Sequence, residues 1–448
     1  MDLANLTAAR AQMALSLGWH IVVACFGVGF PVLALLAEWR WLRTGDEAYR
    51  VLAHRWARAL AVLFAVGAVS GTILSFEFGI LWPGLIGPYG GVMGLPFALE
   101  GFAFFLEAIF LGVYLYGWDR LPPRAHLASG VPVAVAGFAS AWFVVTANAW
   151  MQDPTGFRLA GGRVIDVDPW AAMLNPSTPV LTTKMLLAAY MVTGYGVAAV
   201  YAWKLLRGSR DRYHTLAFVL AFTFAAAMTP AMIIAGDWAA RHVADTQPAK
   251  LAAMEAVYTT QRGAPLVIGG FPVSGQVRGG VEIPRGLSLL ADHDPGSVIA
   301  GLDQVPPADW PNVPVVRTAF QLMVAIGFAQ LALAAWFGLA WWRRRRLPRA
   351  RVFLWGALAA GPGAVLAMEA GWVVTEVGRQ PWIVYQVLRT ADAVTASPGI
   401  GYGLYGLIVV YAALTAGTVF ALQRVAREPL PEIPAVASPD PRSVEVAR

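Results

Sequence analysis

Ionisable side chains within long apolar segments are the first feature of this sequence that suggests chemistry. A charge in the hydrocarbon core of a membrane is costly, so each such residue is a candidate functional group. Glu100 and Glu107 are seven residues apart, about two helical turns, and therefore share one helix face. Glu369 and Glu376 repeat this spacing. The whole set is His20, Glu77, Glu100, Glu107, Glu369 and Glu376.

Several of these side chains are expected to lie at one depth of the membrane. Imidazole and thioether groups are axial ligands of haem iron, whereas buried carboxylates serve as proton relays. Helix packing is the alternative, because methionine and single histidine side chains also fill protein cores. Glu107 is expected deeper, towards the midplane. Four residues lie about one to two helical turns from the same predicted surface: His20, Glu100, Met323 and Glu369.

The composition indicates which elements position these groups. The 448 residues are 58% hydrophobic and 13% charged, against about 25% charge in soluble domains. A single cysteine, Cys25, excludes a disulfide scaffold, a cysteine-ligated iron–sulfur cluster and a zinc finger. Because a spanning helix needs about 20 apolar residues, we predict an all-α, polytopic membrane protein with about nine transmembrane helices. The predicted spans are 14–38, 57–80, 96–117, 128–150, 179–203, 216–236, 317–342, 352–376 and 399–422.

Basic residues gather in alternate connections and predict the orientation. Positive loops face the cytoplasm, so we expect the N-terminus outside and the C-terminus in the cytoplasm. The net charge of +6 then needs no nucleic-acid partner. The basic connections contain Arg40, Arg43, Arg50, Arg55 and Arg58; Arg120 and Arg124; Lys204, Arg207, Arg210 and Arg212; and Arg343, Arg344, Arg345, Arg346, Arg349 and Arg351.

The chain divides into four predicted parts. Residues 1–236 hold the first six spans, and 237–316 form one long outer hydrophilic loop rich in Gly, Pro and Asp. Residues 317–427 hold the last three spans, and 428–448 form a proline-rich tail expected to be disordered in the cytoplasm. Loops as long as 237–316 are usually functional.

Several ordered motifs make the chain resemble subunit I of the cytochrome bd-type quinol oxidases. The resemblance covers nearly the whole chain and rests on the order of the motifs along a nine-helix frame. The motifs are Arg10 and Gln12 before Trp19-His20; Gly71-Thr72 to Phe78-Gly79; Glu100-Gly101 to Phe104-Phe105-Leu106-Glu107; Gly117-Trp118-Asp119-Arg120; Asn148-Ala149-Trp150-Met151-Gln152; Gln247-Pro248-Ala249-Lys250 to Met254-Glu255; Glu369-Ala370-Gly371-Trp372; and Gly378-Arg379-Gln380-Pro381-Trp382.

The resemblance implies a terminal oxidase that passes electrons from quinol to dioxygen and makes water, with protons taken from the cytoplasm. It implies a low-spin haem b, a high-spin haem b, and a haem d or second b-type haem at the oxygen site. It also implies a second oxidase subunit, often a very small third one, and a bacterial or archaeal plasma membrane.

The resemblance also implies roles for individual residues. His20 and Glu369 would be iron ligands of the haem pair at which oxygen is reduced. Met323 would be one axial ligand of the low-spin haem. The remaining assignments are Glu100 beside the haem pair, Glu107 as the proton-delivery acid, Arg10, Trp372 and Arg379 in cofactor binding, and Lys250 and Glu255 in quinol binding by the outer loop.

Two departures from the family affect the same haem. The family usually places a histidine on the fifth span as the second ligand of the low-spin haem, and this chain has Lys184 there. An arginine common two residues before the methionine is Gln321. A deprotonated lysine amine could bind iron, Met323 could act with a weak or absent second ligand, or the low-spin haem could be missing. Lys184 could also extend towards the membrane surface without binding iron.

Three functions follow from these observations. The first is a quinol:dioxygen oxidoreductase. The second is a divergent membrane redox protein of the same fold, with an altered or missing low-spin haem and a different electron donor. The third is a channel or secondary transporter that uses the buried acids to carry protons and contains no haem.

Overall fold

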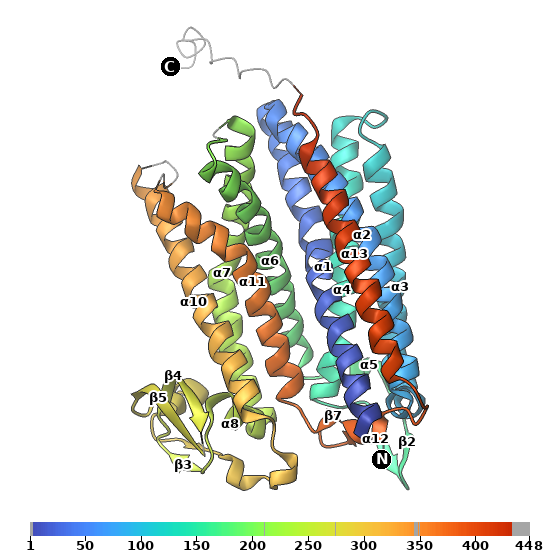
Figure 1. The fold of residues 1–448 in the computed structure, drawn as a ribbon, viewed down its shortest axis with the longest axis vertical. Coiled ribbons are helices and arrows are strands. Elements are labelled where there is room, and N and C mark those ends of the chain that lie inside the picture. The colour runs from blue at the N-terminus through green and yellow to red at the C-terminus, as the bar shows by residue number, and fades with distance from the viewer. Residues whose placement is uncertain (1–2, 210, 274, 345–347, 349, 432–448) are drawn as a thin grey trace.

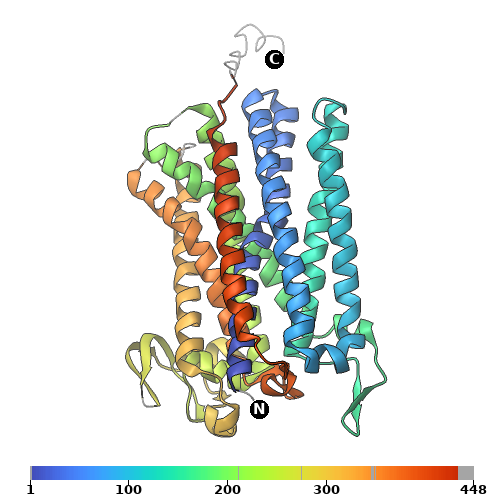
Figure 2. The ribbon, with the colours of Figure 1, turned by 45° about the vertical axis from the view of Figure 1, so that its right-hand side comes forward.

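Nine long helices run side by side through the part of the chain that the structure describes. The structure is a computed structural model that describes residues 3–209, 211–273, 275–344, 348 and 350–431. All nine helices are long and apolar enough to cross a membrane, and each overlaps one predicted span, so the all-α prediction is confirmed (Figures 1 and 2). They are α1 (Leu3–Thr44), α2 (Glu47–Leu81), α3 (Pro83–Tyr116), α4 (Pro123–Gln152), α6 (Thr178–Leu206), α7 (Arg212–Thr246), α10 (Val313–Arg344), α11 (Arg351–Val377) and α13 (Gly401–Arg427).

Short polar signals begin several of these helices. The Asp46 side chain accepts a hydrogen bond from the Ala48 backbone at 3.1 Å and caps α2, as Asp211 caps α7 through His214. Such caps satisfy backbone N–H groups that have no partner within the helix. Asp46 also accepts hydrogen bonds from Arg212 at 2.6 and 3.0 Å, so one carboxylate joins the start of α2 to the start of α7.

Small residues allow the central helices to approach closely. Thr193 of α6 donates a hydrogen bond to the Cys25 carbonyl of α1 at 2.8 Å, and this contact lies beside Gly29. Gly361 of α11 likewise lies against Ala199 of α6. Membrane helices associate through such small-residue contacts because lipid provides no hydrophobic driving force between them.

The two ends of the bundle differ. At the end that we call the basic end, α1 connects to α2, α3 to α4 and α6 to α7, and α13 finishes (Figure 1). At the opposite end, the loop end, lie the N-terminal residues of α1 and the short elements (Figure 1). These are α5 (Pro169–Met173), α8 (Pro248–Glu255), α9 (Gly286–Asp292), α12 (Thr390–Ala393), 3₁₀ turns at Leu302–Gln304 and Pro307–Asp309, and antiparallel pairs β1–β2 (Arg158–Ala160, Arg163–Ile165), β3–β6 (Gln261–Arg262, Val298–Ile299), β4–β5 (Leu266–Val273, Gln276–Ile283) and β7–β8 (Trp382–Val384, Leu388–Arg389).

Helices occupy both edges of the predicted hydrophilic loop 237–316. Helix α7 continues to Thr246 and α10 begins at Val313, so the polar residues at these edges lie on helices. The division of the chain into four parts stays a prediction. The tail from 432 lies outside the described residues. So do four arginines of the orientation prediction: Arg210, Arg345, Arg346 and Arg349.

The α1–α6 contact gives a test of the packing. A Cβ at Gly29 would lie 2.3 Å from the Thr193 hydroxyl, whereas a Cβ at Gly27 would meet nothing within 4 Å. We expect Gly29→Ala to destabilise the protein by about 1–3 kcal/mol. Gly27→Ala should leave stability unchanged or raise it by up to ~1 kcal/mol. Thermal unfolding in detergent would compare the two variants, and equal midpoints would contradict the described contact.

Candidate functional site

His20 is held in one orientation by a neighbouring helix. Its Nδ1 atom lies 2.8 Å from the Ser70 hydroxyl of α2, and among the described residues Nε2 forms no hydrogen bond. A histidine that binds a metal usually uses its other ring nitrogen in this way, which fixes the ring and its tautomer. Gly71 provides the space, because a Cβ there would lie 3.2 Å from the imidazole ring. The site therefore suits a metal ligand at Nε2.

Glu369 approaches the helix of His20 from α11. Its Oε2 atom would lie 3.5 Å from a Cβ at Gly18 of α1. Its Oε1 atom is buried and, among the described residues, has no hydrogen-bond partner. A buried carboxylate oxygen without a partner is costly, and iron is a group that such an oxygen could bind. Glu369 of α11 thus reaches α1 two residues before His20.

A cavity between α6, α10 and α11 brings Lys184 and Met323 together. Its volume is about 130 Å³, below the ~300–1,000 Å³ usual for ligand sites. The Met323 sulfur would lie 3.1 Å from a Cβ at Gly371, so this glycine leaves room beside the thioether. The remaining lining residues include Asn148, Leu181, Met185, Met191, Met232, Gln330, Met368, Trp372 and Thr375.

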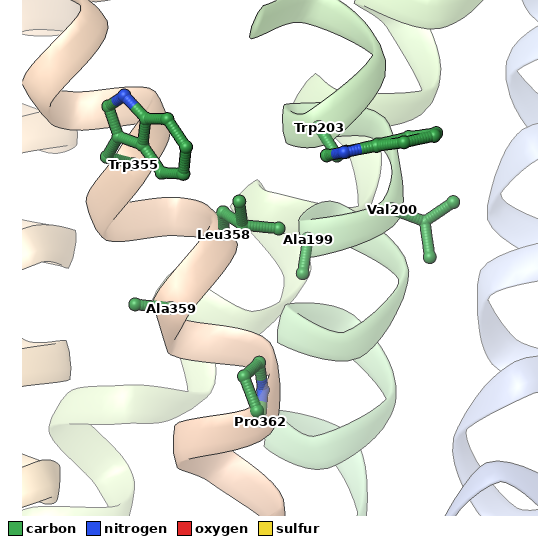
Figure 3. Close-up of a pocket in the computed structure, with 7 residues that line it drawn as sticks. All are labelled: Ala199, Val200, Trp203, Trp355, Leu358, Ala359 and Pro362. Carbon is green, nitrogen blue, oxygen red and sulfur yellow. The ribbon is translucent and has the colours of Figure 1, made fainter.

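The lining residues of this cavity, though not its volume, suit a haem. One lining residue offers an amine and another a thioether, and the rest of the surface is mainly apolar with few polar groups. Trp372, which the motifs assigned to cofactor binding, lines the same cavity. A second cavity, between α6 and α11 near the basic end, shows the contrast (Figure 3). Trp203 and Trp355 border it, and none of its seven lining residues offers a side-chain ligand for iron.

A polar cluster lies at the loop end of the first cavity. The Lys250 amine donates a hydrogen bond to the Gln152 side chain at 2.6 Å, and Asn148 donates one to Glu376 at 2.7 Å. Arg379 pairs with Glu376, but its Nε and Nη1 atoms are buried without partners among the described residues. Two further anionic oxygens would satisfy them, as the propionates of a bound haem could.

Burial changes the charge properties of this cluster. It lowers the pKa of Lys250, and the nearby Arg379 guanidinium lowers it further, while Glu376 opposes the shift. It also lowers the pKa of Arg379, again opposed by Glu376. Three cations, Lys250, Arg379 and Lys184, interact here with one acid, Glu376. An anion in the cavity would therefore be stabilised by several positive groups.

Glu255 has a partner that the sequence did not reveal. Arg317 on α10 is fully buried and lies 3.7 Å from the Glu255 carboxylate. Its Nη2 atom donates hydrogen bonds to the Val267 and Gly269 carbonyls of β4. Burial raises the pKa of Glu255 to about 7, although the Arg317 charge lowers it. Glu255 can therefore exchange a proton near neutral pH.

Glu100 and Glu107 share one face of α3, as predicted from their spacing, and this face borders α4. The Glu107 carboxylate lies against Gly137, whose Cβ would be 3.3 Å from Oε1, and Glu100 lies beside Ser140. Arg10 is exposed and donates a hydrogen bond at 2.7 Å to Gln380, the neighbour of Arg379. It therefore contacts the cofactor-binding motif, not the cavity.

Comparisons with known proteins cover nearly the whole chain. The sequence model of a family described as cytochrome bd terminal oxidase subunit I matches residues 8–430. A Bacillus subtilis (strain 168) protein, provisionally named subunit I of a cytochrome bd menaquinol oxidase, is 36% identical over 427 residues, 93% of this chain and 96% of that protein. Subunit 1 of a cytochrome bd ubiquinol oxidase from the same strain is 30% identical over 440 residues, 94% and 93% of the two chains. The solved bd oxidase from Geobacillus thermodenitrificans matches with TM-score 0.88 and 36% identity, over 94% of this chain and 98% of that chain.

The Glu255–Arg317 pair can be tested by infrared titration. We expect the protonated carboxyl band that disappears in Glu255→Gln to titrate with a pKa of about 7. Arg317→Gln should move this titration to higher pH, because the charge that favours the carboxylate is lost. Arg317→Lys keeps the charge and should shift it less. A wild-type titration near the ordinary glutamate pKa of about 4.3 would contradict the described burial.

Proposed function

The chain belongs to the cytochrome bd terminal oxidase subunit I family, and on this premise we propose that it carries electrons from quinol through haems to dioxygen, forming water. As subunit I of a quinol oxidase, it acts with partner subunits in a bacterial membrane. A second oxidase subunit and a very small third one are the proposed partners, and the plasma membrane is the proposed location. The observation that carries the proposal is the cavity shared by Met323 and Lys184.

The haem pair is proposed to bind between α1 and α11. Bound haem iron would accept and pass on single electrons and bind dioxygen. His20 supplies Nε2 and Glu369 supplies an unpartnered carboxylate oxygen. The Ser70 hydroxyl holds the imidazole ring, so the ligand is oriented before iron binds. A high-spin haem b and a haem d or second haem b are the proposed occupants.

Lys184 and Met323 are proposed as the axial ligands of the low-spin haem b. Both line one cavity, and the unpartnered Arg379 nitrogens offer sites for propionates. These observations favour a retained haem over a missing one. Because Lys184 stands where the family usually has a histidine, a divergent redox protein with another electron donor is the second candidate function. The test of Lys184 below separates the two functions.

Quinol is proposed to bind at the loop end, beside Lys250 and Glu255. Lys250 is a buried hydrogen-bond donor. Its lowered pKa favours the neutral amine, which is less costly than an ammonium group near the apolar quinol ring. Glu255, with a pKa of about 7, is suited to take a proton when quinol is oxidised. Arg317 positions this carboxylate and is an addition to the predicted set.

The protons for water formation are proposed to come from the opposite side. Glu107 lies on the basic-end side of Glu100, and both acids border α4. The basic end carries Arg40, Arg43, Arg120 and other cations, so the positive-inside rule favours the cytoplasm there and the exterior at the loop end. Glu107 would pass protons to Glu100, and Glu100 would deliver them to the haem pair.

Spectroscopy of ligand variants tests the low-spin site. We expect the reduced-minus-oxidised spectrum of the purified oxidase to contain the α band of a low-spin haem b. Met323→Ala and Lys184→Leu should each abolish or shift it, and Lys184→His should restore it because imidazole is a strong iron ligand. Lys204→Leu, a matched change at the other end of α6, should not alter it. An unchanged band in Lys184→Leu would remove Lys184 as a ligand, and no α band in the wild type would favour the second function.

Turnover measurements test the quinol site. Lys250→Ala removes a buried charge-assisted hydrogen bond, so quinol-driven oxygen uptake should fall about 10–100-fold. The absorption spectrum of the haem pair should be unchanged, because His20 and Glu369 lie on other helices. Arg278→Ala on the exposed surface of β5 is the control and should behave as wild type. Wild-type uptake in Lys250→Ala would exclude the assigned role.

A further inference from the structure

A buried acid, imidazole and phenol meet near the basic end, apart from every group used above. Glu38 of α1 is 0% exposed, and Tyr114 of α3 and His126 of α4 are each 2% exposed. The Tyr114 hydroxyl donates a hydrogen bond to Glu38 Oε2 at 2.8 Å. His126 Nδ1 lies 2.7 Å from Glu38 Oε1, and the Tyr114 and His126 rings stack at 4.5 Å. Three helices thus contribute one polar group each.

The hydrogen bonds require this cluster to hold a shared proton. His126 Nε2 lies 2.8 Å from the Tyr114 carbonyl, and a carbonyl oxygen only accepts, so Nε2 carries a hydrogen. The contact between Nδ1 and Glu38 Oε1 then needs one further proton, on either the imidazole or the carboxyl group. Either arrangement leaves the cluster neutral, which suits a site without water contact. The pair therefore stores one proton that two groups can carry.

Tyr114 also continues the line of acids on α3. Glu100, Glu107 and Tyr114 follow one another at intervals of seven residues, about two helical turns and ~10 Å each. The facing helix α4 has a small residue opposite each of them. Ser140 lies beside Glu100, Gly137 beside the Glu107 carboxylate, and Gly130 beside the Tyr114 ring. One helix–helix boundary thus joins the cluster to both acids.

We propose that Glu38, His126 and Tyr114 are the proton-storing group that supplies Glu107 during oxygen reduction. The Tyr114 hydroxyl gives up its proton towards Glu107, and the phenolate then takes the shared proton through the Glu38 carboxyl group, which leaves the Glu38–His126 pair one proton short. A proton from the water at the basic end restores the shared proton. This inference rests on the proposed function, because only oxygen reduction would consume protons at Glu100.

The position of the cluster suits a supply from that end. Glu38 lies six residues before the end of α1, Tyr114 two residues before the end of α3, and His126 in the first turn of α4. Water is therefore about one to two helical turns away. Trp118 covers the imidazole at 4.2 Å and also contacts His54 at 5.1 Å. The charged groups around Trp118 and His54 are Arg50, which pairs with Asp119, and Arg58, which pairs with Glu428.

Glu38→Gln separates proton supply from packing. The amide oxygen can accept from Tyr114 and the amide N–H can donate to His126 Nδ1, so every hydrogen bond is kept while the exchangeable proton is lost. In the complete oxidase we expect oxygen uptake with saturating quinol to fall at least tenfold, with a larger solvent deuterium isotope effect. The haem spectrum and the anaerobic reduction of the haems by quinol should match wild type. Glu38→Asp should restore part of the uptake.

Controls and a second variant complete the test. Glu47→Gln, a matched change on the exposed start of α2 at the same end, should behave as wild type. Tyr114→Phe keeps the ring packing and removes the hydroxyl, so it should also lower uptake and raise the isotope effect, which decides the question if Glu38→Gln does not assemble. Wild-type uptake and isotope effect in Glu38→Gln, or in Tyr114→Phe in that case, would overturn the proposal. A wild-type oxidase without quinol-driven uptake would instead refute the proposed function.

Discussion

The cost of placing a charge away from water governs where this protein keeps its polar groups. In the hydrocarbon region, an ionisable side chain needs a partner within the protein. Glu38 meets this requirement with a phenol and an imidazole, and Glu255 meets it with Arg317. Glu369 Oε1 and two nitrogens of Arg379 do not meet it among the described residues. Glu255 Oε2 and two nitrogens of Arg317 likewise lack hydrogen-bond partners among the described residues, so the charge of Arg317 stabilises Glu255 without a hydrogen bond between them.

The same constraint explains why Lys184 is informative. A cationic lysine in an apolar cavity would be as costly as an unpaired acid. None of the cavity's described lining residues is an acid, and Lys250 and Arg379, which lie beyond its loop end, add positive charge. A neutral amine bound to iron removes this difficulty, and the propionates of the same haem would neutralise the cations. A haem bound here would therefore account for the excess positive charge. Its iron would bind the neutral Lys184 amine, and its propionates would neutralise Lys250 and Arg379.

Much of the fold could be predicted from sequence because each membrane-spanning helix requires a long apolar segment. Nine apolar segments became nine helices, and the seven-residue spacing of Glu100 and Glu107 placed both acids at one boundary. Hydropathy gives the depth of a residue but not its neighbour on another helix. Glu255 and Arg317 are separated by 62 residues and Glu38 and His126 by 88, so neither pair could be found. His126 lies outside the predicted fourth span, 128–150, yet α4 begins early enough to bury it.

The separation of the two polar systems decides how the reaction would act on the membrane. From Tyr114 to Glu100 the line along α3 covers fourteen residues, or ~21 Å, of a hydrocarbon core ~30 Å thick. Lys250 and Glu255 lie at the opposite end, on α8. On the proposed function, quinol oxidised there would release its protons at the loop end, while oxygen reduction would take its protons through the basic end. Charge would then be separated across the bilayer without a proton pump, because the same electrons would leave protons on one side and consume them from the other.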